Sequence, residues 1–532
     1  MSAFGSLLLQ PVLATSDCVA SSFTPLLPSN ASLVSVVHVP RNGSFGSAPG
    51  DDLEFPTNAT GLPALCAVTV HVISSADSSF NFGLFLPTDR GAWNGRIMTG
   101  GNGGFAGGIN WPDMGIFSHY GFASLSTDTG HNAGGFDASW ALNQPESIID
   151  WSFRAMHESV LLGKRLTAAF YNRPIAHSYY AGCSTGGRQG LKEVQMFPDD
   201  FDGIVVGAPA WWTSHLQPWT VEVGLRNLPV DGPGRLNATH FTTAAKEILR
   251  QCDPQDGVKD GIISDPDGCR FIPDTLLCTG ATSTNCLTGP QLDTLFELTH
   301  DWVDVNQTFV FPHLALGADL SALTSGTAAH PAGTGWVVNF LLNDTEFDFN
   351  TEFDFSTVQL ADAINPGRAN ADDFDMSAFE RRGGKIIHYH GYADQLIPTG
   401  SSIYFRQHVQ RAMAPAGTAL DDFYRFFLIP GMGHCAGSTT APWYIAGGSQ
   451  LIQGADHGVP GFEDPAHDAI LAIMAWVEHG KAPSTIIATK FVNDSAPLGV
   501  ERQRPLCPYP SEAKFTGKGD VDAAESWVCV SV

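Results

Sequence analysis

One serine in this chain has the neighbours of an enzyme nucleophile. Residues 182–186 form the sequence's single G-x-S-x-G motif, with Ser184 at its centre. The motif lies between a predicted strand at 178–182 and a predicted helix at 188–197, which is the setting of a nucleophile elbow. Glycines on both sides let the chain turn sharply and leave the hydroxyl exposed. The motif therefore predicts a nucleophilic Ser184, with an ordinary glycine-rich turn as the alternative.

A serine hydroxyl attacks efficiently only when a base accepts its proton. In hydrolases with such an elbow, the acid and then the histidine follow the serine along the chain. Asp394 directly follows a predicted strand at 385–390, and His434 directly follows another at 424–429. Active-site loops gather at such strand ends. We expect His434 to act as the base and Asp394 to orient it, although a turn aspartate and a loop histidine are the alternatives.

Two other histidines, His388 and His390, alternate along the strand before Asp394. Residues two apart on a strand share one face of the sheet. We interpret both as packing residues rather than as the catalytic base.

The anion that forms after attack needs backbone N–H donors. Thr185, the residue after the nucleophile, is predicted to supply one. The glycine-rich run at 100–104 follows an early strand, and Gly101 is predicted to supply the other. A plain turn or a phosphate-binding loop is the alternative, but the G-K-[ST] of a Walker motif is missing.

Strands and helices alternate on both sides of a long irregular stretch. The pattern predicts an α/β fold, specifically an α/β-hydrolase fold with a large inserted lid domain and a mainly parallel sheet. The catalytic domain is expected at 15–208 and 383–532, with the inserted domain at 209–382. The other predicted elements are strands at 67–74, 80–87, 96–99 and 203–208, and helices at 148–171, 401–412 and 464–478.

Cysteines directly adjoin two of the proposed catalytic residues. Cys183 precedes Ser184, and Cys435 follows His434. If the serine and histidine are hydrogen-bonded, their neighbours are close enough for a disulfide. Two unrelated buried cysteines are the alternative.

With this arrangement of Cys-Ser, Asp and His-Cys, the chain resembles the tannase/feruloyl esterase family. The resemblance spans nearly the whole chain. It implies a carboxylic ester hydrolase acting on phenolic-acid esters. Feruloyl esters of plant cell-wall polysaccharides are the expected substrates, with galloyl esters of tannins as the alternative. It also implies four further disulfides, which pair residues 18–66, 252–269, 278–286 and 507–529.

The inserted stretch also holds an acidic loop between Cys252 and Cys269. Carboxylates on a glycine-bearing loop suit a hard cation such as calcium, although an acidic turn without metal is the alternative. The family resemblance implies a structural calcium at this loop. Its ligands would be the side chains of Asp253, Asp256 and Asp260 and the backbone carbonyls of Val258 and Ile262.

Aromatic residues of the inserted stretch are candidates for the phenolic ring site. Trp336 and Phe340 are predicted to bind substrate, with a role in the core of the inserted domain as the alternative.

Composition and sequons favour secretion. Ten cysteines and seven N-x-[ST] sites suit an oxidising, glycosylating route, and residues 1–14 are a possible signal-peptide remnant. The 54 acidic residues against 28 basic ones disfavour nucleic acid and anionic membranes as partners. We expect an extracellular monomer or homodimer.

Two other classes of function were weighed. A non-catalytic glycan-binding protein on a hydrolase scaffold would not need the serine, aspartate and histidine together. A metal-dependent hydrolase would need a histidine cluster such as HExxH, which the sequence lacks.

Overall fold

A nine-stranded sheet runs through the centre of the protein. The computed structural model describes residues 17–89, 91–280 and 285–531, so the possible signal-peptide remnant lies outside them. The strand order is β1-β4-β5-β7-β6-β8-β9-β12-β13. These strands span Ala31–Val39 (β1), Leu65–Ile73 (β4), Ser79–Pro87 (β5), Arg96–Gly100 (β6), Ala123–Thr127 (β7), His177–Cys183 (β8), Gly203–Gly207 (β9), Lys385–Gly391 (β12) and Tyr424–Ile429 (β13).

The sheet is antiparallel at one side and parallel over the rest. The pairs β1–β4, β4–β5 and β5–β7 are antiparallel, whereas every pairing from β7 to β13 is parallel. The predicted mainly parallel sheet is therefore confirmed. Its antiparallel margin includes β1 and β7, which the sequence pattern did not predict.

Helices cover both faces of the sheet. One buried core joins strand residues such as Ile204 and Ile386 to helices α4 (Ala155–Phe170), α5 (Thr185–Met196) and α12 (Thr399–Met413). The second core lies on the opposite face, where Val205 and Ile387 pack against α2 (Trp111–His119) and α13 (Ala469–His479). Alternate strand residues thus enter different cores. Each large apolar side chain buried in this way contributes about 1.5–3 kcal/mol.

The predicted helices are present with shifted ends. The helix expected at 148–171 is divided into α3 (Pro145–Ile149), a π-helical turn, η3 (Asp150–Arg154), and α4. The helix expected at 464–478 begins later, as α13, because the Asp468 side chain accepts the backbone N–H groups of Ile470 and Leu471.

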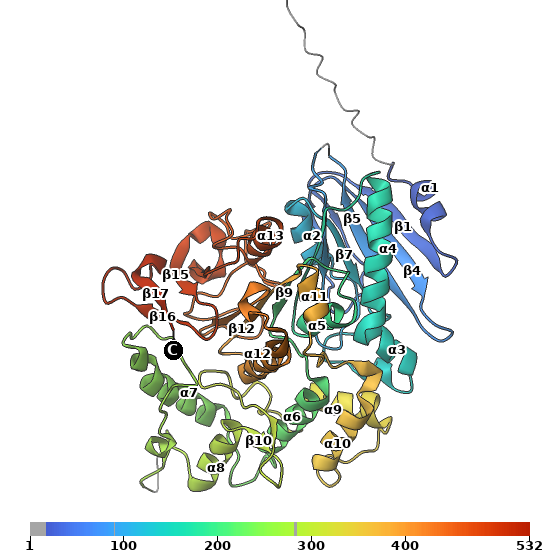
Figure 1. The fold of residues 1–532 in the computed structure, drawn as a ribbon. Helices are drawn as coiled ribbons and strands as arrows, with labels where there is room; N and C mark the ends of the chain where they lie inside the picture. The colour runs from blue at the N-terminus through green and yellow to red at the C-terminus, as the bar shows by residue number, and fades with distance from the viewer. Residues whose placement is uncertain (1–16, 90, 281–284, 532) are drawn as a thin grey trace, which may run out of the picture.

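A long excursion separates two neighbouring strands of the sheet. Strand β9 ends at Gly207, and its parallel partner β12 begins at Lys385. Most of the chain between them, green to yellow in Figure 1, lies below the sheet in that view and has its own apolar core, whereas Phe379 near its end belongs to a core of the sheet. It contains α6 (Thr213–Leu225), α7 (Ala238–Cys252), α8 (Gly289–Leu298), β10 (Trp302–Val303), β11 (Phe309–Phe311), α9 (Pro331–Trp336), α10 (Phe355–Ile364) and α11 (Ser377–Arg381).

Short elements at both ends of the chain complete the fold. The remaining ones are α1 (Ala20–Phe23), the pair β2 (Gly43–Phe45) and β3 (Ala59–Leu62), and near the C-terminus two further pairs: β14 (Ile486–Phe491) with β15 (Val500–Leu506), and β16 (Glu512–Phe515) with β17 (Trp527–Val530).

All ten cysteines are paired. The structure confirms the disulfides 18–66, 183–435, 252–269, 278–286 and 507–529. Within the part of the chain that the structure describes, helices of bilayer-spanning length and hydropathy are missing.

Candidate active site

Ser184 occupies a sharp turn between a strand and a helix. Strand β8 ends at Cys183 and α5 begins at Thr185, so Ser184 is the helix N-cap, with φ 62° and ψ −123°. A non-glycine residue with positive φ costs of order 1–3 kcal/mol and persists only where its surroundings impose it. Here its N–H donates to the Gly207 carbonyl at 3.0 Å, and its carbonyl accepts the Ala210 N–H at 3.0 Å. The predicted elbow is therefore present.

The glycines after Ser184 allow close packing of the elbow. A Cβ at Gly186 would lie 2.8 Å from the carbonyl oxygen of Asn102, and one at Gly187 would lie 2.4 Å from that of Gly207. A larger residue at either position would push the turn away from the neighbouring strands.

Asp394 and His434 form one hydrogen-bonded pair. His434 Nδ1 lies 2.8 Å from Asp394 Oδ2, and Asp394 is 1% exposed. Its Oδ1 accepts the backbone N–H groups of Leu396 and Ile397 at 2.8 and 2.9 Å. Burial by itself would raise the pKa of Asp394, but the charge of His434 and the hydrogen bonds from His390 and His434 hold it well below its usual range. Asp394 is therefore a carboxylate that orients the imidazole.

A disulfide links the two halves of the site. Cys183 and Cys435 are bonded, with their Cα atoms 5.9 Å apart, and Ser184 and His434 line the same cavity. Among the described residues, no hydrogen bond joins Ser184 Oγ to the imidazole of His434. Such bonds often tighten only when substrate is bound, and the three predicted residues are brought to one place.

The cavity at Ser184 is narrow, about 60 Å³, and largely apolar. Helix α6 and other parts of the inserted stretch form one wall, and Gln217 presents a buried side-chain oxygen without a hydrogen-bond partner. The lining residues that the sequence reasoning missed include Phe105, Phe136, Gln217, His330 and Leu396. Except for Gln217 on α6, these residues lie outside helices and strands, where the sequence carries no periodic signal.

Trp336 and Phe340 do not line this cavity. They are 1% and 3% exposed and belong to an apolar cluster with Trp151 and Phe105. Phe340 packs behind Phe105, with ring centroids 5.3 Å apart. The predicted substrate contacts are therefore corrected: both aromatic residues pack in a core, and Phe105 is the aromatic member of this cluster that reaches the cavity.

The predicted oxyanion donor Gly101 is also corrected. Its N–H donates to the Ala181 carbonyl at 3.1 Å, which extends the β6–β8 ladder and leaves no N–H for a substrate. Gly101 is small for another reason, since a Cβ there would lie 2.3 Å from the Tyr180 hydroxyl. Gly104, by contrast, lines the cavity beside Ser184 and Thr185. Its N–H and that of Thr185 take part in no hydrogen bond among the described residues.

Comparison with known proteins identifies the family. Residues 66–530 match the family described as tannase and feruloyl esterase. The chain belongs to this family. A probable feruloyl esterase B-1 of Aspergillus oryzae is 36% identical over 515 residues, covering 94% of this chain and 91% of the relative. Feruloyl esterase B of Aspergillus niger is 36% identical over 470 residues, covering 88% and 87%.

Solved structures agree with this family and fold. The crystal structure of feruloyl esterase B from Aspergillus oryzae superposes with a TM-score of 0.86 at 34% identity, covering 95% of this chain and 97% of that one. The tannin acyl hydrolase of Aspergillus niger shares the fold, with a TM-score of 0.75 at 24% identity, covering 98% and 97%. The protein is an α/β-hydrolase-type carboxylic ester hydrolase of the tannase and feruloyl esterase family, whose members act on phenolic esters.

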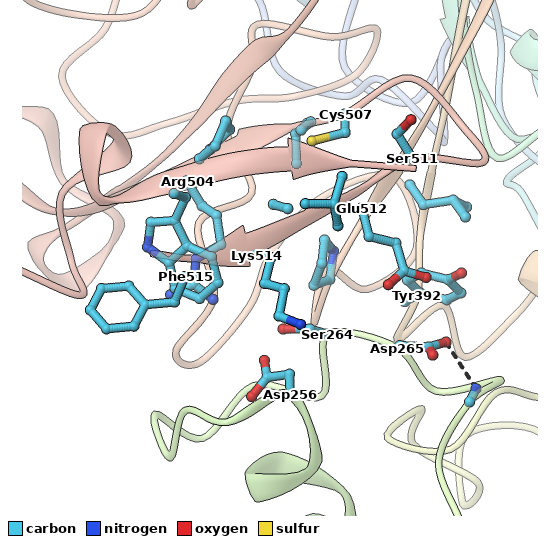
Figure 2. Close-up of a pocket in the computed structure, with 18 of the residues that line it drawn as sticks. Asp256, Ser264, Asp265, Tyr392, Arg504, Cys507, Ser511, Glu512, Lys514 and Phe515 are labelled. Carbon is cyan, nitrogen blue, oxygen red and sulfur yellow. Dashed lines mark hydrogen bonds between the residues drawn. The ribbon is translucent and has the colours of Figure 1, made fainter. Parts of the chain in front are cut away.

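The acidic loop of this esterase borders a cleft of about 440 Å³ between the inserted stretch and the C-terminal strands. Figure 2 shows Asp256 and Ser264 on one side and Lys514 extending toward them from β16. Asp256 Oδ1 accepts the Val258 N–H at 2.8 Å, while its buried Oδ2 has no hydrogen-bond partner. Burial raises the pKa of Asp256.

The rest of the loop fits a hard cation only in part. Asp253 Oδ1 accepts the N–H groups of Asp260 and Gly261, and no described residue donates a hydrogen bond to the carbonyls of Val258 or Ile262. Asp260 Oδ2, however, already pairs with Arg504 at 2.8 Å. The orphaned Asp256 oxygen and the free carbonyls are the atoms that fit calcium; the Arg504 ion pair leaves Asp260 only partly available.

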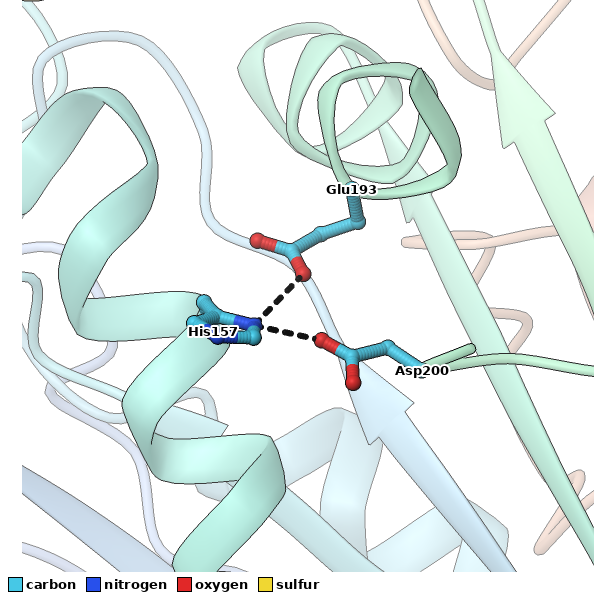
Figure 3. A group of neighbouring side chains, drawn as sticks. All are labelled: His157, Glu193 and Asp200. Atoms are coloured by element: carbon cyan, nitrogen blue, oxygen red, sulfur yellow. Dashed lines mark hydrogen bonds and ion pairs between the residues drawn. The ribbon is translucent and has the colours of Figure 1, made fainter. Parts of the chain in front are cut away.

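A different set of side chains has metal-ligand spacing. Within the described residues, the group of three ligand atoms within 4.8 Å of one another comes from His157, Glu193 and Asp200 (Figure 3). His157 Nδ1 lies 2.7 Å from Asp200 Oδ2 and 3.9 Å from Glu193 Oε2. Burial, followed by the charge of Asp200, raises the pKa of Glu193 well above its usual range. Among the described residues, neither buried carboxyl oxygen of Glu193 has a hydrogen-bond partner. A protonated Glu193 beside the Asp200 carboxylate lowers the negative charge of the cluster.

Proposed function

We propose that this protein is a secreted serine esterase that hydrolyses feruloyl (hydroxycinnamoyl) esters of plant cell-wall polysaccharides. The observation that carries the proposal is the convergence of Ser184 and His434 on one cavity. The Cys183–Cys435 bond joins their neighbours, and Asp394 orients the imidazole. This arrangement suits acyl transfer through a serine nucleophile.

In the first half-reaction, Ser184 Oγ attacks the ester carbonyl and His434 Nε2 accepts its proton. Asp394 holds Nδ1–H and stabilises the imidazolium that forms. The N–H groups of Thr185 and Gly104 donate to the anionic oxygen of the tetrahedral intermediate. Collapse of the intermediate breaks the ester bond, and His434 gives its proton to the departing alcohol.

In the second half-reaction, water takes the place of the alcohol. His434 accepts a proton from the water as it attacks the acyl-serine, and a second tetrahedral intermediate collapses to release the phenolic acid. The proton returns to Ser184 Oγ, so the enzyme is restored.

A preference for feruloyl esters is supported by the names of the most similar relatives described above. Those at 36% identity are named as feruloyl esterases, whereas the tannin acyl hydrolase at 24% identity supports the shared fold alone. We expect a higher kcat/KM for methyl ferulate than for methyl gallate, measured side by side. A higher value for methyl gallate would reassign the substrate to tannins.

The mechanism is tested by Ser184→Ala. We expect loss of turnover on methyl ferulate by about 10⁴-fold or more, since residues of such a triad act as one unit. A fluorophosphonate probe should label the wild type at Ser184 and leave the variant unlabelled. Wild-type turnover in Ser184→Ala would refute the serine mechanism, and an unlabelled, inactive wild type would favour a binding protein.

Secretion is supported by five disulfides and by the positions of the sequons. All seven sequon asparagines (Asn30, Asn42, Asn58, Asn237, Asn306, Asn343 and Asn493) are exposed, as glycosylation requires. Mass spectrometry of protein from its native host should find N-glycans and no free thiols. Unglycosylated, reduced protein would contradict this localisation.

A structural calcium is also proposed at the acidic loop. Its ligands would be the side chains of Asp253, Asp256 and Asp260 and the carbonyls of Val258 and Ile262, with the buried unpaired oxygen of Asp256 as the supporting observation. Bound there, calcium would neutralise the carboxylates and hold the loop.

A further inference from the structure

A row of buried, hydrogen-bonded polar side chains leads from Tyr424, at the start of β13, to Asp394. The Tyr424 hydroxyl on β13 lies 2.6 Å from Nδ1 of His388 on β12. His388 Nε2 lies 3.0 Å from Ser402 Oγ on α12, and Ser402 Oγ lies 2.7 Å from His390 Nδ1. His390 Nε2 then lies 3.1 Å from Asp394 Oδ2 and 3.0 Å from the Ile397 carbonyl oxygen.

Every side chain of this row is cut off from solvent. Tyr424, His388, Ser402 and His390 are 0% exposed, and Asp394 is 1% exposed. Burying so many polar groups is costly unless each finds a partner. The two histidines do pack against the sheet, as their alternation predicts, but on that face they also form a continuous hydrogen-bonded chain.

The acceptors at the Asp394 end of this row determine which group donates in each hydrogen bond. Asp394 as a carboxylate and the Ile397 carbonyl are acceptors only, so His390 must carry a proton on Nε2. In the neutral ring Nδ1 is then an acceptor, and the Ser402 hydroxyl must donate to it. Ser402 in turn accepts from His388 Nε2–H, which leaves His388 Nδ1 to accept from the Tyr424 hydroxyl. The reverse direction would set the bare Nε2 lone pair of His390 against two acceptors.

The surroundings favour a neutral His388. Burial lowers the pKa of His388 well below its usual value, and the nearby charge of Arg406 acts in the same direction. Tyr424 also lies near Arg406, and burial raises its pKa far above the usual value.

We propose that His390 and Ser402 are positioning residues of the active site. Ser402 fixes the Nε2–H tautomer of His390, and His390 fixes the Asp394 carboxylate that orients His434. This inference rests on the proposed serine mechanism and adds to it the residues that hold its acid in place.

The geometry at Asp394 shows what this support does. Oδ1 is held by two backbone N–H groups, and Oδ2 is shared between His390 Nε2 and His434 Nδ1. Without the His390 donor, Oδ2 would be held by the catalytic imidazole alone. The carboxylate could then rotate about its side chain, and His434 would lose its fixed position.

The chain offers a matched pair of serines for the test. Ser401 and Ser402 are neighbours on α12 and are 1% and 0% exposed, yet Ser401 Oγ has no hydrogen-bond partner. Ser402→Ala removes the link to both histidines, whereas Ser401→Ala removes a hydroxyl of equal size and breaks no side-chain hydrogen bond. His390→Leu removes the donor to Asp394, and His390→Gln places an amide N–H near the former Nε2 position.

The full-length variants are assayed on methyl ferulate, with the active sites counted by fluorophosphonate titration. We expect Ser402→Ala and His390→Leu to lower kcat by about 10- to 100-fold with little change in KM, as displacement of a catalytic group by about 1 Å does. The acid limb of their kcat/KM profiles should shift, because the partner of the base has changed. Ser401→Ala should match the wild type, and His390→Gln should recover most of the kcat lost in His390→Leu.

Three results would overturn the inference: equal kcat for Ser402→Ala and Ser401→Ala, an unchanged pH profile in His390→Leu, or no recovery in His390→Gln. If Ser402→Ala does not fold, the comparison of His390→Gln with His390→Leu decides. Ser184→Ala separates this inference from the mechanism: if Ser184→Ala is inactive while the Ser402 and His390 variants match the wild type, only the positioning role fails.

Discussion

The disulfide between the catalytic loops should affect activity as well as stability. Cys183 and Cys435 are 252 residues apart in sequence. In the chain-entropy treatment, a loop of that length stabilises the fold by at most about 5 kcal/mol. The double variant Cys183→Ala/Cys435→Ala should therefore melt at a lower temperature. Its kcat on methyl ferulate should fall by about 10²-fold, because the His434 loop is no longer tied to the elbow.

The Cys507–Cys529 bond provides the control. It closes a separation of only 22 residues and joins the residue that follows β15 to β17 in the C-terminal region. The same treatment gives about 3 kcal/mol for this loop. Cys507→Ala/Cys529→Ala should melt earlier than the wild type and keep its kcat below the melting temperature. Wild-type kcat in Cys183→Ala/Cys435→Ala, measured per titrated active site, would refute the argument that this bond positions the histidine.

Two further predictions concern stability. Glu193→Gln should stabilise the protein at pH 8 and have little effect at pH 4. The pKa of Glu193 is higher in the folded than in the unfolded protein, so Glu193 does not destabilise the fold below the ordinary Glu pKa of about 4.3. As the pH rises from that value to the folded-state pKa, the free energy of unfolding falls by about 1.4 kcal/mol for each pH unit. Denaturant unfolding at the two pH values measures this, and a variant with equal gain or loss at both would contradict it. Removing calcium with EDTA should lower the melting temperature, and Asp256→Asn should lower it in calcium and reduce the further loss on chelation. Protein that binds no calcium before chelation, or that loses its calcium to EDTA with an unchanged melting temperature, would reject the structural calcium.

Much of the fold and the catalytic trio could be predicted because their signals are local. Strand β8, the glycine-flanked Ser184 and the following helix are contiguous in sequence, and Asp394 and His434 each directly follow an apolar strand. The Cys183–Cys435 pair could be predicted because its members adjoin Ser184 and His434. The other four disulfide pairs came from family resemblance, because spacing alone does not define which cysteines meet.

The errors arose where three-dimensional contacts override local pattern. Gly101 has the right residue type and loop, but its N–H is taken by Ala181 from a strand far along the chain. Trp336 and Phe340 are aromatic residues of the inserted stretch whose packing partners, such as Trp151, come from before that stretch. The predicted packing of His390 against the sheet is present, but its hydrogen bond with Ser402 could not be predicted, because the strand pattern does not reveal which side of the neighbouring helix faces it.

The pairing of β9 with β12 has a consequence for how the protein is made. The apolar strand Gly203–Gly207 is fully buried in the finished sheet. Its first parallel neighbour, β8, precedes it in the chain, but residues 208–384 must be synthesised before its second parallel neighbour, β12, exists. At about 5–20 residues per second this takes roughly 10 to 35 s, during which the nascent chain exposes an unpaired, aggregation-prone edge. The yield of folded enzyme will therefore depend on how well the host keeps that edge soluble while the insertion emerges from the ribosome.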